Sequence, residues 1–310
     1  MEELFVEWPH KKSTISQVKL PGGYEVDLLR DDNLHPQISG NKWRKLKYNV
    51  LKADQKGYYQ ILTYGGAFSN HIAATAAAGK EFGFKTIGVI RGEYDPNNPT
   101  LQFAEKCGMH LHFVSRSAYR EKDSKFFRSD LRKEFGPFFN VPEGGANFEG
   151  IQGCQEIWKD IDKEYDYVIV PCGTCSTMAG LILGNPNPDR TKVVGIPVLN
   201  VNDGLQADLN QKLFQVLYDW ELVEEYKDDY LIFPDFHLGG YAKITSELKD
   251  FVETFKSENA IQLDYIYNGK MMFALSELIG NEIPENSKVL AVHTGGVQGN
   301  EGLRYMGKLQ

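Results

Sequence analysis

The 310-residue chain is poor in the features that mark several specialised classes of protein. Four cysteines are too few for a disulfide framework in a chain of this length, which favours a reducing compartment. No apolar run approaches the ~20 residues that a transmembrane helix needs, and residues 1–7 lack the basic start and apolar stretch of a signal peptide. The net charge of -8 and the scattered basic residues argue against a nucleic-acid surface. We therefore expect a cytoplasmic protein that binds neither membranes nor nucleic acids.

What the chain has is 42% hydrophobic residues and a regular alternation of short apolar runs with amphipathic stretches. This alternation predicts an α/β fold with mainly parallel sheets covered by helices. The predicted strands are 60–64, 86–91, 110–114, 167–170, 193–198, 262–267 and 289–293. The predicted helices are 70–82, 100–107, 148–161, 205–220, 245–256, 271–279 and 299–308.

The length favours two domains rather than one. Glycine pairs mark several turns, and residues 43–144 hold a compact set of β/α units between two such turns. We therefore predict a smaller α/β domain at 43–144. It is inserted into a larger, discontinuous domain made of residues 1–42 and 145–310.

The most informative residue is Lys42, which follows a Gly-Asn turn and stands at the start of a helical pattern. The first turn of a helix normally favours acidic residues, because the helix dipole is positive there. A lysine at this place suits an amine with a lowered pKa, as a Schiff-base-forming nucleophile needs. A solvated lysine among neighbouring basic residues is the plain alternative.

Two loops are candidate anion sites, because each joins a strand to a helix start. In the first, Gly65 and Gly66 precede Ser69 and Asn70, which can cap the helix or expose its N–H groups to a carboxylate. The second offers backbone N–H groups and hydroxyls that suit a phosphate, at Gly173, Thr174, Cys175, Ser176 and Thr177. Neither the P-loop nor the dinucleotide-binding spacing is present. Polar groups at 264–270 and 291–296 are predicted to follow two later strands.

Cys172 and Cys175 allow a rival interpretation, since a C-x-x-C between a strand and a helix is typical of a thioredoxin-like redox pair. The chain is much longer than a thioredoxin-like domain, and the other segments would go unexplained. A zinc site is less favoured still, because there is no second ligand pair, and we expect no metal.

Together, a helix-start lysine, an anion loop, a phosphate cradle and polar strand ends suit a pyridoxal-phosphate enzyme. The chain resembles the 1-aminocyclopropane-1-carboxylate deaminase/D-cysteine desulfhydrase family. The resemblance runs nearly the whole chain, through segments 30–32, 40–46, 69–71, 173–180 and 293–296. It implies the tryptophan-synthase-β-like fold (fold type II), with two open, twisted, mainly parallel sheets, an active site in the interdomain cleft and a homodimer.

The resemblance also implies roles for individual residues. Lys42 would bind pyridoxal 5'-phosphate and later move the substrate proton, Asn70 would bind the cofactor's phenolic oxygen, and Ser69 would lie near the substrate carboxylate. Residues 173–177 would hold the phosphate, although Cys175 and Ser176 stand where the family usually has glycine or alanine. Tyr241 and Tyr267 match its two active-site tyrosines.

Two positions separate the activities of this family. The deaminases resemble one another in placing glutamate after the second tyrosine and leucine before the last glycine pair. This chain has Asn268 and Thr294, and Thr294 resembles the desulfhydrase-like members. A neutral partner such as Asn268 or Thr294 would leave the pyridine nitrogen largely unprotonated. We therefore expect β-elimination from a small amino acid such as D-cysteine, giving pyruvate, ammonia and sulfide. The alternatives are opening of 1-aminocyclopropane-1-carboxylate to 2-oxobutanoate and ammonia and, remotely, a redox or ligand-binding module built on Cys172 and Cys175.

Overall fold

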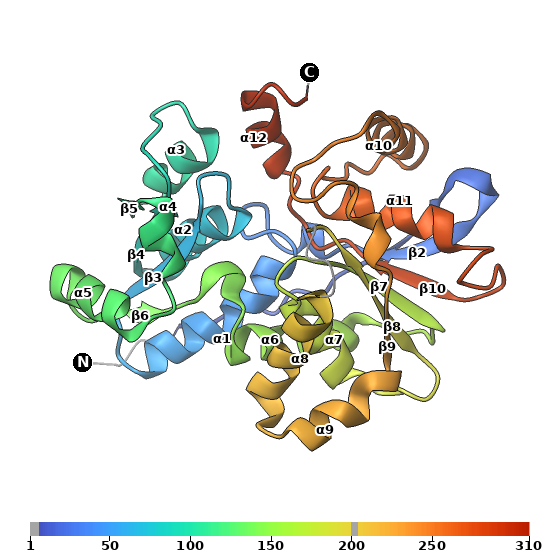
Figure 1. Ribbon diagram of the computed structural model, residues 1–310, viewed down its shortest axis with the longest axis horizontal. Helices are drawn as coiled ribbons and strands as arrows, with labels where there is room; N and C mark the ends of the chain where they lie inside the picture. Colours follow the sequence, from blue (N-terminus) through green and yellow to red (C-terminus); the bar gives the residue numbers. More distant parts are fainter. Residues whose placement is uncertain (1–5, 200–203, 310) are drawn as a thin grey trace.

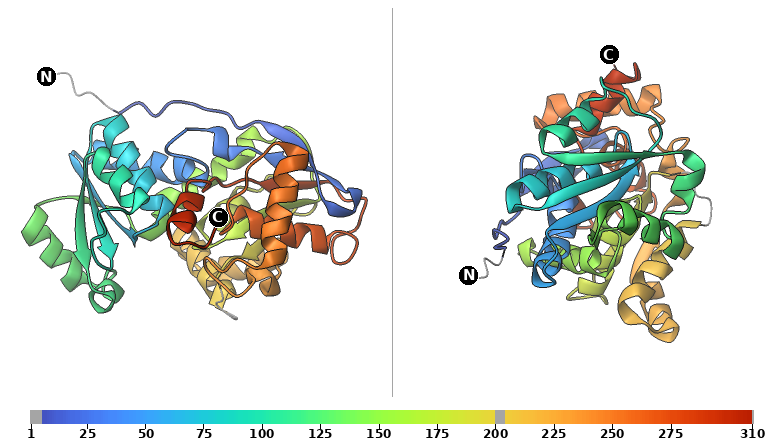
Figure 2. Two further views of the ribbon diagram at one scale, coloured as in Figure 1. Left: turned by 90° about the horizontal axis from the view of Figure 1, so that it is seen from above. Right: turned by 90° about the vertical axis from the view of Figure 1, so that its left-hand side faces the viewer.

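Two sheets lying side by side organise the chain in the computed structural model, which describes residues 6–199 and 204–309 (Figure 1). Residues 6–14 run from the smaller sheet to the outer edge of the larger one (Figure 2). The predicted fold class, with two mainly parallel sheets covered by helices, is confirmed. Within the described ranges, no helix has the length and apolar character to cross a membrane.

The smaller sheet has four parallel strands in the order β5-β4-β3-β6. Alternate strand residues face opposite ways: Ile61 and Ile90 pack against α1, α2 and α3, whereas Leu62 and Val89 pack against α4 and α5. The strands are β3 (Gln60–Gly66), β4 (Lys85–Arg91), β5 (Met109–Val114) and β6 (Phe139–Asn140). The helices are α1 (Asn41–Gln55), α2 (Asn70–Phe82), α3 (Pro99–Lys106), α4 (Arg116–Arg120) and α5 (Lys125–Phe135).

The larger sheet has six strands in the order β1-β2-β10-β7-β8-β9, and only the β1–β2 pair is antiparallel. Helices α10 and α11 cover one face, and α6 to α9 cover the other. The strands are β1 (Ile15–Lys19), β2 (Glu25–Leu29), β7 (Tyr167–Cys172), β8 (Lys192–Pro197), β9 (Tyr230–Ile232) and β10 (Val289–Val292). The helices are α6 (Phe148–Gln155), α7 (Ser176–Gly184), α8 (Gly204–Leu217), α9 (Trp220–Glu225), α10 (Ser246–Asn259), α11 (Asn268–Leu278) and α12 (Gly299–Tyr305).

Short 3-10 turns lie between several of these elements, at Pro21–Gly23, Asp31–Asn33, Glu143–Gly145, Glu156–Asp160, Tyr226–Asp228 and Pro234–His237. The predicted helix 148–161 is therefore an α-helix followed by one such turn. Every strand of the smaller sheet comes from within residues 60–140, and the larger sheet uses strands from both sides of that segment. The predicted domain boundaries at 43–144 stay a prediction.

One predicted strand is wrong. Residues 262–267 form no strand, because the Asp264 carboxylate accepts hydrogen bonds from the backbone N–H groups of Ile266, Tyr267 and Asn268 at 2.9, 2.6 and 3.0 Å. These bonds turn the chain and start α11 at Asn268, three residues before the predicted helix at 271. The other six predicted strands are present, with shifts of one or two residues at their ends.

Candidate active site

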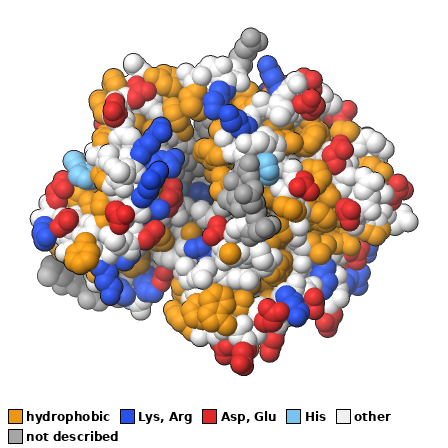
Figure 3. All heavy atoms as spheres, viewed as in Figure 1, with side chains coloured by type: hydrophobic (Ala, Val, Ile, Leu, Met, Phe, Trp, Pro, Cys, Tyr) orange, Lys and Arg blue, Asp and Glu red, His pale blue; other side chains and the backbone are white. Residues whose placement is uncertain are grey.

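A cavity of about 520 Å³ lies where the carboxyl ends of the strands of both sheets meet, and Figure 3 shows the surface hollowed between the two parts. Open α/β sheets bind ligands at this end of their strands, and the volume suits a small molecule. Of the predicted site residues, all except Ser176 and Asn268 line the cavity, which brings together Lys42, Ser69, Asn70, Gly173, Thr174, Cys175, Thr177, Tyr241, Tyr267 and Thr294.

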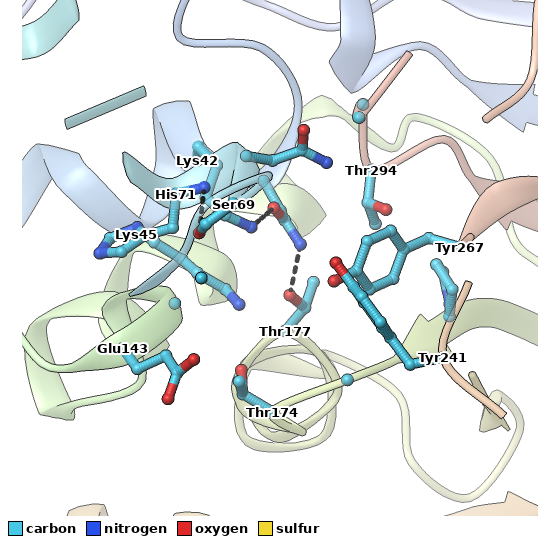
Figure 4. A pocket seen from close by; sticks show the side chains of 18 of the residues that line it. Lys42, Lys45, Ser69, His71, Glu143, Thr174, Thr177, Tyr241, Tyr267 and Thr294 are labelled. Atoms are coloured by element: carbon cyan, nitrogen blue, oxygen red, sulfur yellow. Dashed lines mark hydrogen bonds between the residues drawn. The ribbon is translucent and has the colours of Figure 1, made fainter. Parts of the chain in front are cut away.

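Lys42 lies in the first turn of α1, and its amine opens into the cavity (Figure 4). The residue is half-buried, and its amine lies inside the cavity. Burial, together with the positive charge of Lys45, lowers the pKa of Lys42 to about 7. The amine donates a hydrogen bond of 2.8 Å to Asn41 Oδ1. A large fraction of the amine is therefore uncharged at neutral pH, as a nucleophile or base requires.

The start of α1 is hydrogen-bonded to the turn that follows β10. Gly40 has φ +66°, and a Cβ there would lie 1.9 Å from the carbonyl oxygen of Thr294, so only glycine fits. Asn41 donates its backbone N–H to the same oxygen at 3.0 Å and its side-chain amide to Thr177 Oγ1 at 3.0 Å. One asparagine thereby joins the lysine to the loop at 173–177.

The loop after β3 presents the start of α2 to the cavity. Ser69 caps this helix, and its hydroxyl accepts from the backbone N–H groups of His71 and Ile72 at 3.2 and 3.4 Å. The predicted capping role is therefore present, and the residue still lines the cavity. The Asn70 amide lies against Gly296 and Gly299, close enough that a Cβ at Gly296 would be 3.1 Å from its nitrogen.

The loop at 173–177 forms the floor of the cavity and leads into α7 (Figure 4). Cys175 adopts a left-handed backbone with φ +56°, which turns the chain into the helix. Thr174 Oγ1 and Ser176 Oγ lie 3.0 Å apart, but Ser176 is fully buried and does not line the cavity. Free N–H groups of the helix start and the hydroxyls of Thr174 and Thr177 form a donor set that suits a phosphate.

Tyr241 and Tyr267 form the wall opposite Lys42 (Figure 4), with ring centroids 6.4 Å apart at 71°. Burial raises the pKa of both phenols, and the charge of Tyr241 adds to the rise at Tyr267. Tyr241 is 47% exposed as a residue because it stands at the rim, while its hydroxyl end reaches inward. Both hydroxyls remain protonated at neutral pH and can donate to a ligand.

Asn268 does not face the cavity, because its amide is used entirely within the protein. Its oxygen accepts from the backbone N–H of Thr294 at 2.9 Å, and its nitrogen donates to Asp264 and to the carbonyl of Gly295, both at 2.6 Å. Asn268 therefore holds the turn after β10 in place. Thr294 is the residue of this pair that lines the cavity.

Sequence analysis missed several lining residues, among them Lys45, His71, Arg91 and Glu143. Burial lowers the pKa of Lys45, which stands one helical turn after Lys42. Burial and the two lysines lower the pKa of His71, whose Nε2 lies 2.8 Å from Thr63 Oγ1 and whose Nδ1 has no partner within the described part of the chain. The i, i+3 spacing of the two lysines was the available signal.

Cys172, at the end of β7, and Cys175, in the loop that follows, are both reduced and buried. The hydrogen-bonding interaction with Cys175, which favours the protonated Cys172 thiol, and burial raise the pKa of Cys172. A redox-active cysteine needs a lowered thiol pKa and access, so this environment disfavours the redox interpretation. In the described ranges, no three histidine, cysteine, aspartate or glutamate side chains are grouped as metal ligands.

These residues fit pyridoxal phosphate. The cavity offers an amine of lowered pKa for the cofactor's aldehyde, a helix start with hydroxyls for its phosphate, and a neutral hydroxyl, that of Thr294, on a third side. Lys45 also lines the cavity, one helical turn after Lys42, and adds an amine to this donor set. An anion and an aldehyde on one small molecule match this donor set.

The chain belongs to the family of pyridoxal-phosphate dependent enzymes, whose model matches residues 19–295. It is therefore an enzyme of this cofactor class. The chain is 28% identical to a putative 1-aminocyclopropane-1-carboxylate deaminase of Pyrococcus horikoshii, over 95% of this chain and 91% of the relative. It is also 28% identical to a mitochondrial bifunctional D-cysteine desulfhydrase/1-aminocyclopropane-1-carboxylate deaminase of Arabidopsis thaliana, over 90% and 74%.

Solved structures agree on the fold. The crystal structure of an ACC deaminase homologue matches with a TM-score of 0.82 and 27% identity, covering 98% of this chain and 96% of that one. Serine racemase from Dictyostelium discoideum matches with a TM-score of 0.67 at 16% identity, covering 92% of each chain, which shows a shared fold alone. The predicted family and cofactor are confirmed.

Proposed function

We propose that this enzyme is a lyase that removes the β-substituent of a small amino acid, with D-cysteine or a near analogue as substrate. Cysteine and water would give pyruvate, ammonia and hydrogen sulfide. The observation that carries the proposal is the Lys42 amine, which burial leaves partly uncharged at neutral pH and which lies opposite the protonated hydroxyls of Tyr241 and Tyr267. A base and a set of proton donors on opposite sides of one cavity suit an elimination.

The residues divide the work as follows. Lys42 Nζ holds the cofactor and later takes the α-proton of the substrate. Ser69 and the start of α2 bind the substrate carboxylate, and Asn70 orients the cofactor's phenolic oxygen. The hydroxyls of Tyr241 and Tyr267 supply a proton to the departing sulfur. Bound pyridoxal phosphate supplies the electron sink that makes loss of the α-proton possible.

Thr294 favours β-elimination within this family. Thr294 lines the cavity with a neutral side chain, and its hydroxyl donates to Oδ1 of Asn268, which carries no charge, at 3.3 Å. A neutral partner leaves the cofactor's ring nitrogen largely unprotonated, which weakens the electron sink and favours prompt loss of the leaving group over transamination. Residues 173–177 and Lys45 would hold the phosphate.

The second candidate is deamination of 1-aminocyclopropane-1-carboxylate to 2-oxobutanoate and ammonia. The names of several relatives favour it, and Ser69 offers a hydroxyl on the cavity wall as a nucleophile. This substrate has no α-proton, so Lys42 or a tyrosine would act on a ring proton instead. A homodimer, a cytoplasmic location and the domain boundaries at 43–144 stay predictions.

The test begins with the visible spectrum of the purified protein. We expect a band near ~410–430 nm that borohydride removes, with the reduced cofactor mapped to Lys42. The same preparation is then given D-cysteine, L-cysteine and 1-aminocyclopropane-1-carboxylate in separate assays for sulfide, pyruvate and 2-oxobutanoate. Sulfide with pyruvate supports the elimination, and 2-oxobutanoate alone would replace it by the deamination.

A further inference from the structure

The loop that carries Tyr241 has a strained backbone. Leu238 and Ala242 have φ +51° and +53°, in the left-handed region that side chains other than glycine rarely adopt. Gly239 and Gly240 between them also have positive φ, at +83° and +103°. Glycine adopts positive φ without strain, but the left-handed conformations of Leu238 and Ala242 persist only where surrounding groups hold them.

Lys270 is the group that holds this loop. Its amine donates to the backbone carbonyls of His237 at 2.7 Å and Gly240 at 2.6 Å, and the residue is fully buried. Lys270 stands in the first turns of α11, the helix that Tyr267 precedes. On the far side of Tyr241, Lys308 donates to the carbonyl of Ala242 at 3.2 Å. Lysine amines therefore bind the carbonyls immediately before and after Tyr241.

A buried lysine is costly at this position. No carboxylate in the described part of the chain lies within ion-pair distance of it, and a helix start disfavours a cation. Burial lowers its pKa to about 8, although Asp264 opposes the shift from a distance. A lysine amine donates up to three hydrogen bonds and needs no acceptor, so it can join carbonyls that face each other across a turn.

We propose that Lys270 is a positioning residue, which fixes the loop of residues 237–243 so that the Tyr241 hydroxyl meets Tyr267 inside the cavity. Tyr241 stands at the rim and is 47% exposed, so a released loop can carry it into solvent. Lys42 and the loop at 173–177 lie on other elements. Losing Lys270 therefore disturbs Tyr241 and leaves the cofactor in place.

The first arm of the test needs no substrate. In the holoenzyme, Lys270→Met removes the donors and keeps a side chain of similar length, and Lys243→Met, an exposed lysine of the same loop, is the matched control. The backbone N–H groups of Gly239, Gly240 and Lys243 are hydrogen-bonded within the loop. We expect their hydrogen exchange to accelerate at least tenfold in Lys270→Met alone, with the cofactor absorbance unchanged. Unchanged exchange, or acceleration spread over the whole chain, would overturn the proposal.

The second arm is a double-mutant cycle, and it rests on the proposed lyase function. Tyr241→Phe should lower kcat/KM about 100-fold, and Lys270→Met about tenfold. If Lys270 acts through Tyr241, adding Lys270→Met to Tyr241→Phe changes kcat/KM less than about twofold. If the losses in kcat/KM of the two single variants multiply in the double variant, the proposal is contradicted.

Should Lys270→Met not fold, Lys308→Met tests the same loop from its other side, with the same exchange readout. Failure of the lyase assay in wild type leaves the exchange arm intact.

Discussion

Helix α1 carries four basic residues within six positions and places them in opposite environments. Arg44 lies between buried carboxylates: its Nη2 is 2.7 Å from Asp31 Oδ1 and 2.6 Å from Asp160 Oδ2. Lys42 and Lys45 instead face the cavity, and neither has a carboxylate within ion-pair distance in the described ranges. The first face fixes the helix, and the second face leaves amines available for chemistry.

The difference shows that burial alone does not decide what a basic residue does. Burial opposes the charge of both Arg44 and Lys42, but Asp31 and Asp160 reverse its effect and raise the pKa of Arg44. At Lys42 nothing reverses it, and the pKa falls to about 7. A paired cation stabilises the fold, and an unpaired one becomes a base or nucleophile.

Replacing Lys42 gives the largest expected effect, on activity and not on stability. We expect Lys42→Ala to lower turnover by roughly 1000-fold or more, because the amine is both the cofactor's attachment point and the base. The free energy of unfolding of the apoprotein should change by less than about 1 kcal/mol. Product assays and urea unfolding check the two halves. Retained steady-state activity would contradict the assignment of Lys42.

Replacing Arg44 should reverse that pattern. Arg44→Met leaves Asp31 and Asp160 buried without their cation, which costs about 3–5 kcal/mol. Urea unfolding of the apoprotein at pH 7 measures the loss. Folded Arg44→Met should still bind the cofactor at Lys42, because the guanidinium does not line the cavity. If Arg44→Met loses no more stability than Lys42→Ala, then the paired cation does not stabilise the fold more than the unpaired one, and the comparison between the two faces fails.

Sequence reasoning identified Lys42 but could not separate Arg44 from Lys45. The turn before Lys42 and the loop at 173–177 are local patterns, and local patterns are readable from a sequence. The role of Arg44 depends on Asp160, which is 116 residues away in the chain. That ion pair forms only in the folded protein, so no local sequence motif predicts it.

Dependence on the folded structure also explains the wrong strand at 262–267 and why the role of Lys270, which binds the loop of residues 237–243, was missed. The alternating apolar residues at 262–267 indicate a strand, but one carboxylate, Asp264, binds three backbone N–H groups and turns the chain. Lys270 was visible in the sequence, yet its targets are carbonyls of a loop 30 residues earlier. The tyrosine itself could be matched by resemblance, and the group that holds it could not.

Lys45 offers a smaller change that sharpens the comparison. Its positive charge lowers the pKa of Lys42, so Lys45→Met should raise that pKa above about 7, by up to about one unit. The uncharged fraction of Lys42 then falls at neutral pH. We expect the rate at which apoprotein reacts with pyridoxal, which lacks the phosphate, to reach half its maximum at a higher pH than in wild type.

The initial rise of the aldehyde adduct's absorbance between about pH 6 and pH 9 gives this midpoint. Lys47→Met is the control, because Lys47 is on the same helix but does not line the cavity. An unchanged midpoint in Lys45→Met would mean that burial alone sets the pKa of Lys42.

Lys47 should give the smallest effect, since it is a paired cation at a partly buried site. Its amine is 2.6 Å from Glu156 Oε2. Burial opposes the charge of Glu156, but Lys159 and Lys47 outweigh it and lower the pKa of this carboxyl to about 2. Lys47→Met should cost about 1 kcal/mol of unfolding free energy at pH 7, well below the cost of Arg44→Met.

The pH dependence of that loss follows from the sign of the shift at Glu156. A carboxyl whose pKa is lower in the folded state than in the unfolded state stabilises the fold above the unfolded value of about 4.5. This stability is lost as the pH falls through the folded value of about 2. Urea unfolding of wild type and Lys47→Met should therefore differ most above pH 5 and converge towards pH 2. If the difference in unfolding free energy instead stays constant over this range, Lys47 stabilises the fold through the packing of its methylene chain and not through its charge.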